Sequence, residues 1–183
     1  KIEPPAVLLS MDVEPWTAAG AAAGRGSESG DAGVAKSLAF LSRLEHRATF
    51  FVLGSWAERH ASLVREIVSA GHEVASHGYS HRTAQEMGPA VFEEEARRSK
   101  ALLEQAGGRQ VLGYRCPNWG VTPQSPWALP ALRRAGFAYD ASVLSGGSYP
   151  AIGSWPGAIP GLRGLDEGAE AELLEGVGED VAV

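Results

Sequence analysis

The chain has 183 residues, of which 44% are hydrophobic and 21% are charged, and it carries a formal net charge of −6. These proportions are typical of one globular domain, and the acidic balance argues against a nucleic-acid-binding protein, which needs basic side chains to neutralise phosphates. A single cysteine excludes an internal disulfide framework, and no apolar run approaches the roughly 18 residues of a membrane span.

Short apolar segments alternate with longer segments of helical periodicity along the chain. In chain order, the sequence predicts a strand at residues 6–10, a helix at 34–44, a strand at 48–52, a helix at 62–70, a strand at 73–76, a helix from Pro89 to Gly107, a strand at 111–114, a helix that Ser125 caps and that ends at Gly136, and a strand at 137–140. This alternation predicts parallel βαβ units and the α/β class. Both an open sheet and a barrel are compatible with it.

Two segments have no predicted element. Residues 18–33 are rich in Ala, Gly and Ser, and we interpret them either as a mobile loop at the rim of the site or as an insertion without function. Residues 145–183 form a tail that is rich in Gly and Pro and then acidic. We treat residues 1–183 as a single domain that includes both segments.

Polar side chains follow the predicted strands where each strand ends. Because the carboxyl ends of parallel strands meet at one rim, these side chains are expected to share one site. They are Asp12 and Glu14 after the first strand, His77 and His81 after the third, Arg115 after the fourth, and Asp140 in the fifth.

The acidic pair and the histidine pair together suggest a metal centre. Asp12 and Glu14 are two residues apart, so both side chains face the same way in extended backbone. His77 and His81 have a spacing that can present two imidazoles to one ion. Two histidines and one carboxylate recur in catalytic zinc sites, where water occupies the open position. The alternative is a set of solvated polar residues at strand ends.

Further residues are candidates for roles around this centre. Arg115 is suited to hold a catalytic carboxylate in its ionised form, or it forms a surface salt bridge. Aromatic residues are candidates for lining a sugar-binding cleft, although aromatic side chains also belong to ordinary cores. They are Trp16, Tyr79, Trp119 and Trp155.

Several ordered motifs resemble those of the NodB-homology polysaccharide deacetylases, which form carbohydrate esterase family four. They are SMDVE at 10–14, RATFFVLG at 47–54, AGHEVASHGYSH at 70–81, GYRCP at 113–117 and FAYD at 137–140. The motif at 70–81 is the most specific of them. The resemblance covers about residues 6–144 and is closest to the exosortase-associated branch.

The resemblance implies a distorted (β/α)₇ barrel of the TIM type. It also implies metal-dependent hydrolysis of N-acetyl, or sometimes O-acetyl, groups on a glycan such as an exopolysaccharide, peptidoglycan or a chitin-like polymer. The implied roles are catalytic base for Asp12, orientation of that base for Arg115, metal ligation by Glu14, His77 and His81, and a wall of the substrate cleft for Asn118 and Trp119.

One departure from the family leaves alternatives open. The family's last motif supplies a histidine as general acid, whereas no histidine follows His81 in this sequence. At 183 residues the chain is also shorter than the roughly 250 typical of a barrel, which suggests a fragment or a diverged tail. A non-catalytic carbohydrate-binding relative and a small-substrate amidohydrolase of the same fold are therefore alternatives. No signal peptide is visible after Lys1, and the compartment and oligomeric state stay open.

Overall fold

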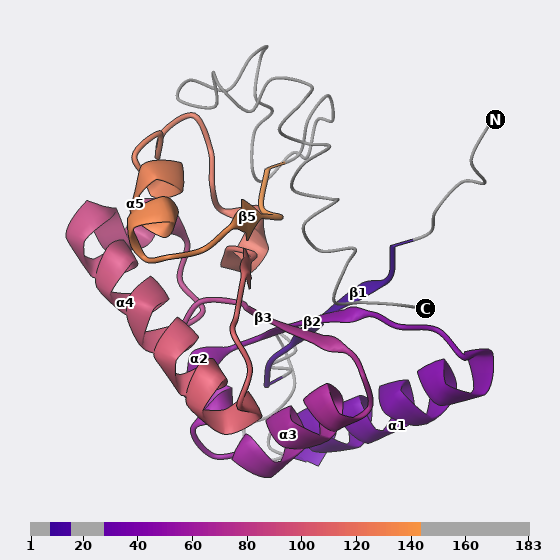
Figure 1. Cartoon of the computed structure of the whole chain (residues 1–183). Coiled ribbons are helices and arrows are strands. Elements are labelled where there is room, and N and C mark those ends of the chain that lie inside the picture. The colour runs from indigo at the N-terminus through magenta and orange to yellow at the C-terminus, as the bar shows by residue number, and fades with distance from the viewer. Residues whose placement is uncertain (1–7, 16–27, 144–183) are drawn as a thin grey trace, which may run out of the picture.

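The computed structural model describes residues 8–15 and 28–143 (Figure 1). In these residues the strands form one parallel sheet in the order β1-β2-β3-β4-β5, so that each strand lies beside the next one in the chain. Doubly wound sheets reverse their order, whereas barrels keep it. The strands are β1 (Ser10–Val13), β2 (Thr49–Val52), β3 (Glu73–Ser76), β4 (Gly113–Tyr114) and β5 (Tyr139–Asp140).

Helices lie along one side of this sheet, where α3 and α4 contact β3 (Figure 1). Short helical turns follow β2 and β4 directly. The helical elements are α1 (Glu28–Leu44), α2 (Gly54–Ala57), α3 (Ala61–Ser69), α4 (Ala84–Gly107), the 3₁₀ turn η1 (Pro117–Trp119) and α5 (Ala128–Arg134). None of the helices in the described part of the chain is long and apolar enough to cross a membrane.

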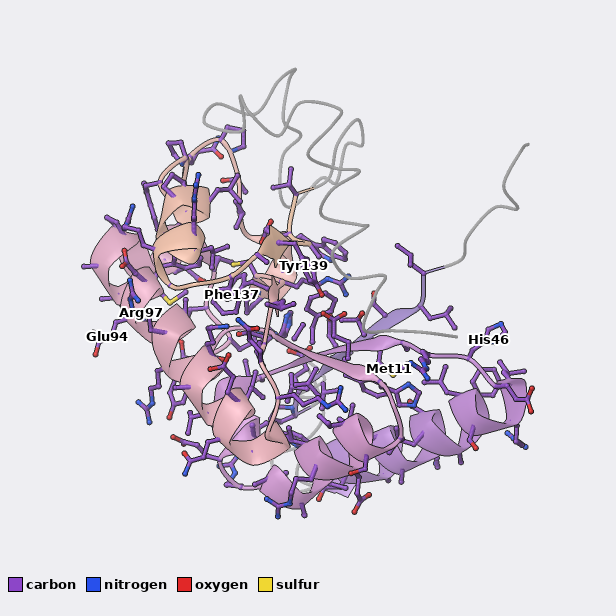
Figure 2. The ribbon with its side chains drawn as sticks, in the orientation of Figure 1. Met11, His46, Glu94, Arg97, Phe137 and Tyr139 are labelled. Carbon is purple, nitrogen blue, oxygen red and sulfur yellow. The ribbon has the colours of Figure 1, made fainter. Side chains whose placement is uncertain are left out.

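The hydrophobic core fills the space between the sheet and the helices. Phe50 and Val52 of β2 are fully buried in it, together with Ile67 of α3 and Phe92 of α4. Met11 of β1 packs against the same core, and Figure 2 shows it between β1 and the helices. Alternate residues of a strand point to opposite faces, so the intervening side chains of β1 and β2 face away from the helices.

The strands occur where apolar periodicity predicts them, with shifted ends. β3 coincides with the predicted segment 73–76, and β2 begins one residue later than predicted. β1 begins at Ser10 and runs to Val13, so Asp12 lies within the strand instead of after it. A carboxylate at the end of a strand looks like a loop residue in the sequence, which is why the predicted strand ended too early.

The prediction of a loop over residues 18–33 is wrong for its described part, because α1 begins at Glu28. The Asp31 carboxylate is 3.2 Å from the Nε2 atom of His60, which precedes α3, and this contact ties the start of α1 to the neighbouring helix. The apolar pattern begins only at Val34, so the sequence showed no signal for the first turns. Residues 18–27 and the predicted tail 145–183 lie outside the described residues.

The predicted helix start at Pro89 is confirmed, because the backbone of α4 breaks at Gly88 and resumes as helix at Pro89. A short segment that was not predicted precedes it: α4 begins at Ala84, where Thr83 and Glu86 form a capping box. The predicted start of the next helix needs correction. α5 begins at Ala128, and Ser125 does not cap it. Instead, the Ser125 hydroxyl accepts a hydrogen bond from the Thr122 amide and donates one to the Thr122 carbonyl.

Candidate metal centre and active site

The carboxyl ends of β1 and β3 bring three possible metal ligands together. One ligand atom from each of Glu14, His77 and His81 lies within 4.8 Å of the other two. The His77 Nε2 atom is 3.7 Å from the Glu14 Oε2 atom, and the His81 Nε2 atom contacts the same oxygen. Because β1 and β3 flank β2 in parallel register, their ends project these side chains over the same rim.

A backbone carbonyl fixes the orientation of the His77 ring. Nδ1 of His77 donates a hydrogen bond to the Arg115 carbonyl oxygen over 2.9 Å, since a carbonyl can only accept. This bond assigns the proton to Nδ1 and leaves the Nε2 lone pair directed toward Glu14. Metal-binding histidines usually have such an outer partner, which sets their tautomer.

The electrostatics of Glu14 and His77 suit a cation, whereas His81 has to release its proton to bind one. The contact with His81 lowers the pKa of the Glu14 carboxyl, although partial burial opposes this effect. The same contact raises the pKa of His81. Burial lowers the pKa of His77, which favours the neutral imidazole. An ionised carboxylate and a neutral imidazole are the states that coordinate a metal.

The surroundings of the Glu14 Oε2 atom test whether a metal ion fits this site. It is buried, and within the described residues it makes no hydrogen bond of acceptable geometry. Buried carboxylate oxygens are normally satisfied by donors, and a metal ion satisfies one equally well. One carboxylate oxygen and two imidazole nitrogens within 4.8 Å of one another form a donor set that fits a divalent transition metal.

Arg115 holds Asp12 beside the three ligands. Its Nη1 atom donates to the Asp12 carboxylate over 2.9 Å, and its Nη2 atom donates to the Ser10 hydroxyl over 3.0 Å. The guanidinium lies between two aromatic rings, 3.8 Å from the centroid of Phe51 and 4.6 Å from that of Trp119. Two hydrogen bonds and two cation–π contacts hold the guanidinium, which in turn holds the Asp12 carboxylate near the ligands.

The predicted aromatic residues lie in different places. Trp119 lies in η1, and its ring covers the guanidinium of Arg115. Asn118 is exposed beside it, and both residues have a left-handed backbone with a φ of 54°. The Tyr79 hydroxyl donates to Glu58, and Arg98 lies over the Tyr79 ring.

Tyr79 therefore contacts residues at the end of α2 and in α4, and its role in a substrate cleft stays a prediction. Trp16 and Trp155 lie outside the described residues.

Sequence reasoning missed the residues that support Arg115. Ser10 and Phe51 lie within two of the motifs, but no role was predicted for either, because their role arises from strand register: Asp12 pairs with Phe51 across β1 and β2. Once parallel pairing is assumed, alternation places Ser10, Asp12 and Phe51 on the face away from the helices. That signal was available, but only after the registers were known.

Asp140 belongs to a neighbouring network. Its carboxylate accepts hydrogen bonds from the amide and the hydroxyl of Ser142. The Ser142 hydroxyl in turn accepts one from the amide of Cys116, next to Arg115. Burial raises the pKa of Asp140 to about 6. This aspartate therefore supports the backbone after β4 from the end of β5.

The family model for polysaccharide deacetylases matches residues 4–139. The chain belongs to the polysaccharide deacetylase family. A peptidoglycan deacetylase of Helicobacter pylori is 29% identical over 82% of this chain and 54% of its own length. A chitooligosaccharide deacetylase of a Bradyrhizobium species is 30% identical over 76% of this chain and 69% of its own length. The chain spans about half the length of the first of these deacetylases.

Solved structures of the family confirm the predicted barrel. A family 4 carbohydrate esterase from Streptomyces lividans, in complex with acetate, superposes with a TM-score of 0.59 at 28% identity over 76% of this chain and 62% of that chain. A family 4 pseudoenzyme from Bacillus anthracis superposes with a TM-score of 0.54 at 18% identity over 73% and 42%. Because enzymes and pseudoenzymes share this fold, activity has to be argued from the site. The narrower resemblance to the exosortase-associated branch stays a prediction.

Proposed function

We propose that this polysaccharide deacetylase hydrolyses N-acetyl groups on a glycan, with Asp12 as the base and with Glu14, His77 and His81 as ligands of one Zn²⁺ ion. The observation that carries the proposal is the juxtaposition of an arginine-held carboxylate with three convergent metal ligands. Arg115 joins the two parts of this arrangement, because its side chain donates to Asp12 and its backbone carbonyl accepts from His77.

The donor set supports zinc among the divalent metals. Two imidazole nitrogens and one carboxylate oxygen form a common ligand set of catalytic zinc, which keeps a position for water or substrate. When bound, such an ion lowers the pKa of a water ligand and polarises the acetyl carbonyl. His77 and His81 would supply the two nitrogen ligands, and Glu14 would supply the oxygen ligand with the negative charge that attracts the cation.

Asp12 accepts the proton of the attacking water. Arg115 positions this carboxylate, because its guanidinium donates one hydrogen bond to Asp12 while a second bond to the Ser10 hydroxyl holds the guanidinium in place. Asn118 and Trp119 follow Arg115 at the same rim, and we assign them to one wall of the substrate cleft. Trp16 keeps its proposed role in substrate binding.

An N-acetylated glycan is the substrate class we propose. The names of the relatives from Helicobacter pylori and Bradyrhizobium support this class, since peptidoglycan and chitooligosaccharides both carry N-acetylated sugars. The shared chemistry is an acetamido group on a pyranose ring, which presents the carbonyl that a metal polarises.

Acetate release tests the proposal. The purified chain is incubated with N-acetylchitooligosaccharides and with peptidoglycan, before and after treatment with a chelator. We expect release that the chelator abolishes, that Zn²⁺ restores, and that Asp12→Asn removes while zinc stays bound. Release that survives chelation or Asp12→Asn would overturn the assigned roles. Glycan binding without release of acetate would instead identify a carbohydrate-binding relative.

A further inference from the structure

The loop that carries both histidines, residues 77–81, has a backbone that its surroundings hold in place. Gly78 has a φ of 75°, and a side chain there would approach the Tyr114 hydroxyl to 3.3 Å. His81 has a φ of 62°, which a residue other than glycine keeps only where neighbouring contacts maintain it. The position of the metal ligands therefore depends on what anchors this loop.

Two buried serines anchor Gly78. The Gly78 amide donates to the Ser76 hydroxyl over 3.1 Å, and the Gly78 carbonyl accepts from the Ser99 hydroxyl over 2.9 Å. The two hydroxyl oxygens are 2.8 Å apart. Ser76 ends β3, whereas Ser99 lies in the middle of α4, and both side chains are fully buried.

The proton positions in this cluster follow from its geometry. A carbonyl cannot donate, so the Ser99 proton points to the Gly78 oxygen. Ser76 must then donate its own proton to the Ser99 oxygen, because Ser99 has no second proton to give. The three residues form a closed ring in which every hydroxyl donates once and accepts once. We call Ser76, Gly78 and Ser99 the serine ring.

We propose that Ser99 is a positioning residue for the metal centre, which it serves from α4 without contacting the ligands. Its hydroxyl fixes the Gly78 carbonyl, and through this carbonyl it sets the placement of His77 and His81 on either side. The inference rests on the proposed function, since it assumes that these histidines bind zinc. A second donor, the Gly54 amide, bonds the same carbonyl over 2.8 Å, so loss of Ser99 loosens the loop without releasing it.

Zinc affinity is the measurement that tests Ser99. The Zn²⁺ dissociation constant is determined by competition with a chromophoric chelator for the wild type and for Ser99→Ala, Ser76→Ala and the double variant. Groups that hydrogen-bond metal ligands directly typically contribute about 10–100-fold to affinity, and we expect a loss of at most about 10-fold for each single variant, because both serines act through the Gly78 backbone. Because either substitution opens the ring, the double variant is expected to bind no more weakly than the weaker single variant.

Ser125→Ala is the matched control. Ser125 is also a fully buried serine with a hydroxyl that both donates and accepts, but its partner is Thr122. This variant loses the same atom and is expected to keep the wild-type affinity. The absorption spectrum of bound Co²⁺ provides a second readout, which a general loss of stability would not change: it is expected to shift in Ser99→Ala and to stay constant in Ser125→Ala.

The outcomes separate this inference from the proposed function. If the wild type binds zinc and Ser99→Ala binds it equally well, or if Ser125→Ala loses as much affinity, the role of Ser99 is wrong and the metal centre stands. Additive losses in the double variant would also refute a ring that acts as one unit. If the wild type itself binds no zinc, the metal centre is wrong and the inference falls with it.

Discussion

Arg115 serves both halves of the site with different groups. Its side chain donates to Asp12, whereas its backbone carbonyl accepts from His77. Substitution of the side chain therefore removes the partner of the base and leaves the partner of the metal ligand. We expect Arg115→Met to lower the rate of acetate release by about 10²–10⁴-fold, the range typical of general acid–base catalysis, while one zinc stays bound. Steady-state kinetics and metal analysis of the purified variant test this.

Arg97→Met is a suitable control for Arg115→Met. Arg97 lies on the exposed face of α4, where it pairs with Glu93, and Figure 2 shows its side chain directed away from the molecule. Its loss is expected to leave the rate unchanged. A loss of zinc in Arg115→Met would mean that the two functions of this residue are not separable.

Asp140 makes stability depend on pH. Its pKa in the folded protein is about 6, above the ordinary 3.8, so the folded state binds the proton more tightly than the unfolded state. Stability from this group is therefore highest below pH 4 and decreases as the pH rises to about 6. We expect Asp140→Asn to flatten this dependence. Urea unfolding of both metal-free proteins between pH 4 and 7 measures it, and an unchanged slope in the variant would contradict the assignment.

The sequence predicted those site residues that lie a few positions from a partner in the same segment. The spacing of Asp12 and Glu14 and that of His77 and His81 both show in the sequence because each pair lies in one segment. Ser99 is different, since its partners Ser76 and Gly78 come from another segment and only tertiary packing brings them together. No local pattern distinguishes Ser99 from any other serine in a helix.

At the scale of elements, apolar periodicity predicted the strands and the long helices. It did not predict the short helical turns. Residues 73–76 form a strand as predicted, and the apolar pair Val74 and Ala75 at its centre is buried. α2 and η1 were not predicted, since each is a single turn with no repeating pattern. Both turns follow a strand directly, and η1 carries the residues that extend the site.

The contact between β4 and β5 requires a glycine. A side-chain carbon at Gly113 would lie 2.1 Å from the Tyr139 ring, whose hydroxyl donates to Glu73 of β3. We expect Gly113→Ala to lower the free energy of unfolding by about 1–3 kcal/mol or more, because the ring cannot move without losing this hydrogen bond. Urea denaturation followed by circular dichroism measures the change.

Gly33→Ala provides the opposite expectation. Gly33 lies within α1, and a side-chain carbon there would meet nothing within 4 Å. Alanine favours helix, so this variant is expected to gain about 0.5–1 kcal/mol. If Gly113→Ala and Gly33→Ala changed the free energy of unfolding equally, close packing around Gly113 would not be the reason why glycine occurs there.

At the scale of the whole molecule, zinc would connect two strands that are distant in the sequence. Glu14 follows β1, and His77 and His81 follow β3, so the three ligands converge only in the folded protein. A ligand that binds only the folded state stabilises it, by about 2.7 kcal/mol when its free concentration is 100 times the dissociation constant. We expect zinc to raise the melting temperature of the wild type and not that of His77→Ala, as measured by thermal unfolding with and without chelator. An equal rise in both proteins would place the zinc elsewhere.

The architecture was predictable as a class, but the barrel was not derivable from periodicity. Strands that alternate with helices occur in open sheets and in barrels alike, and only the order of the strands separates the two. That order arises from contacts between segments far apart in the chain. The resemblance of the motif at 70–81 to a known family supplied the answer that periodicity could not.

The consecutive left-handed residues Asn118 and Trp119 have a consequence for any attempt to make this protein more thermostable. Selection for heat resistance alone would favour glycine at these positions, since glycine adopts such backbone angles without strain. Replacement of Trp119 would also uncover the guanidinium of Arg115. Substitutions that raise thermal stability at this turn are therefore expected to lower activity. A set of variants designed for stability should leave Asn118 and Trp119 unchanged.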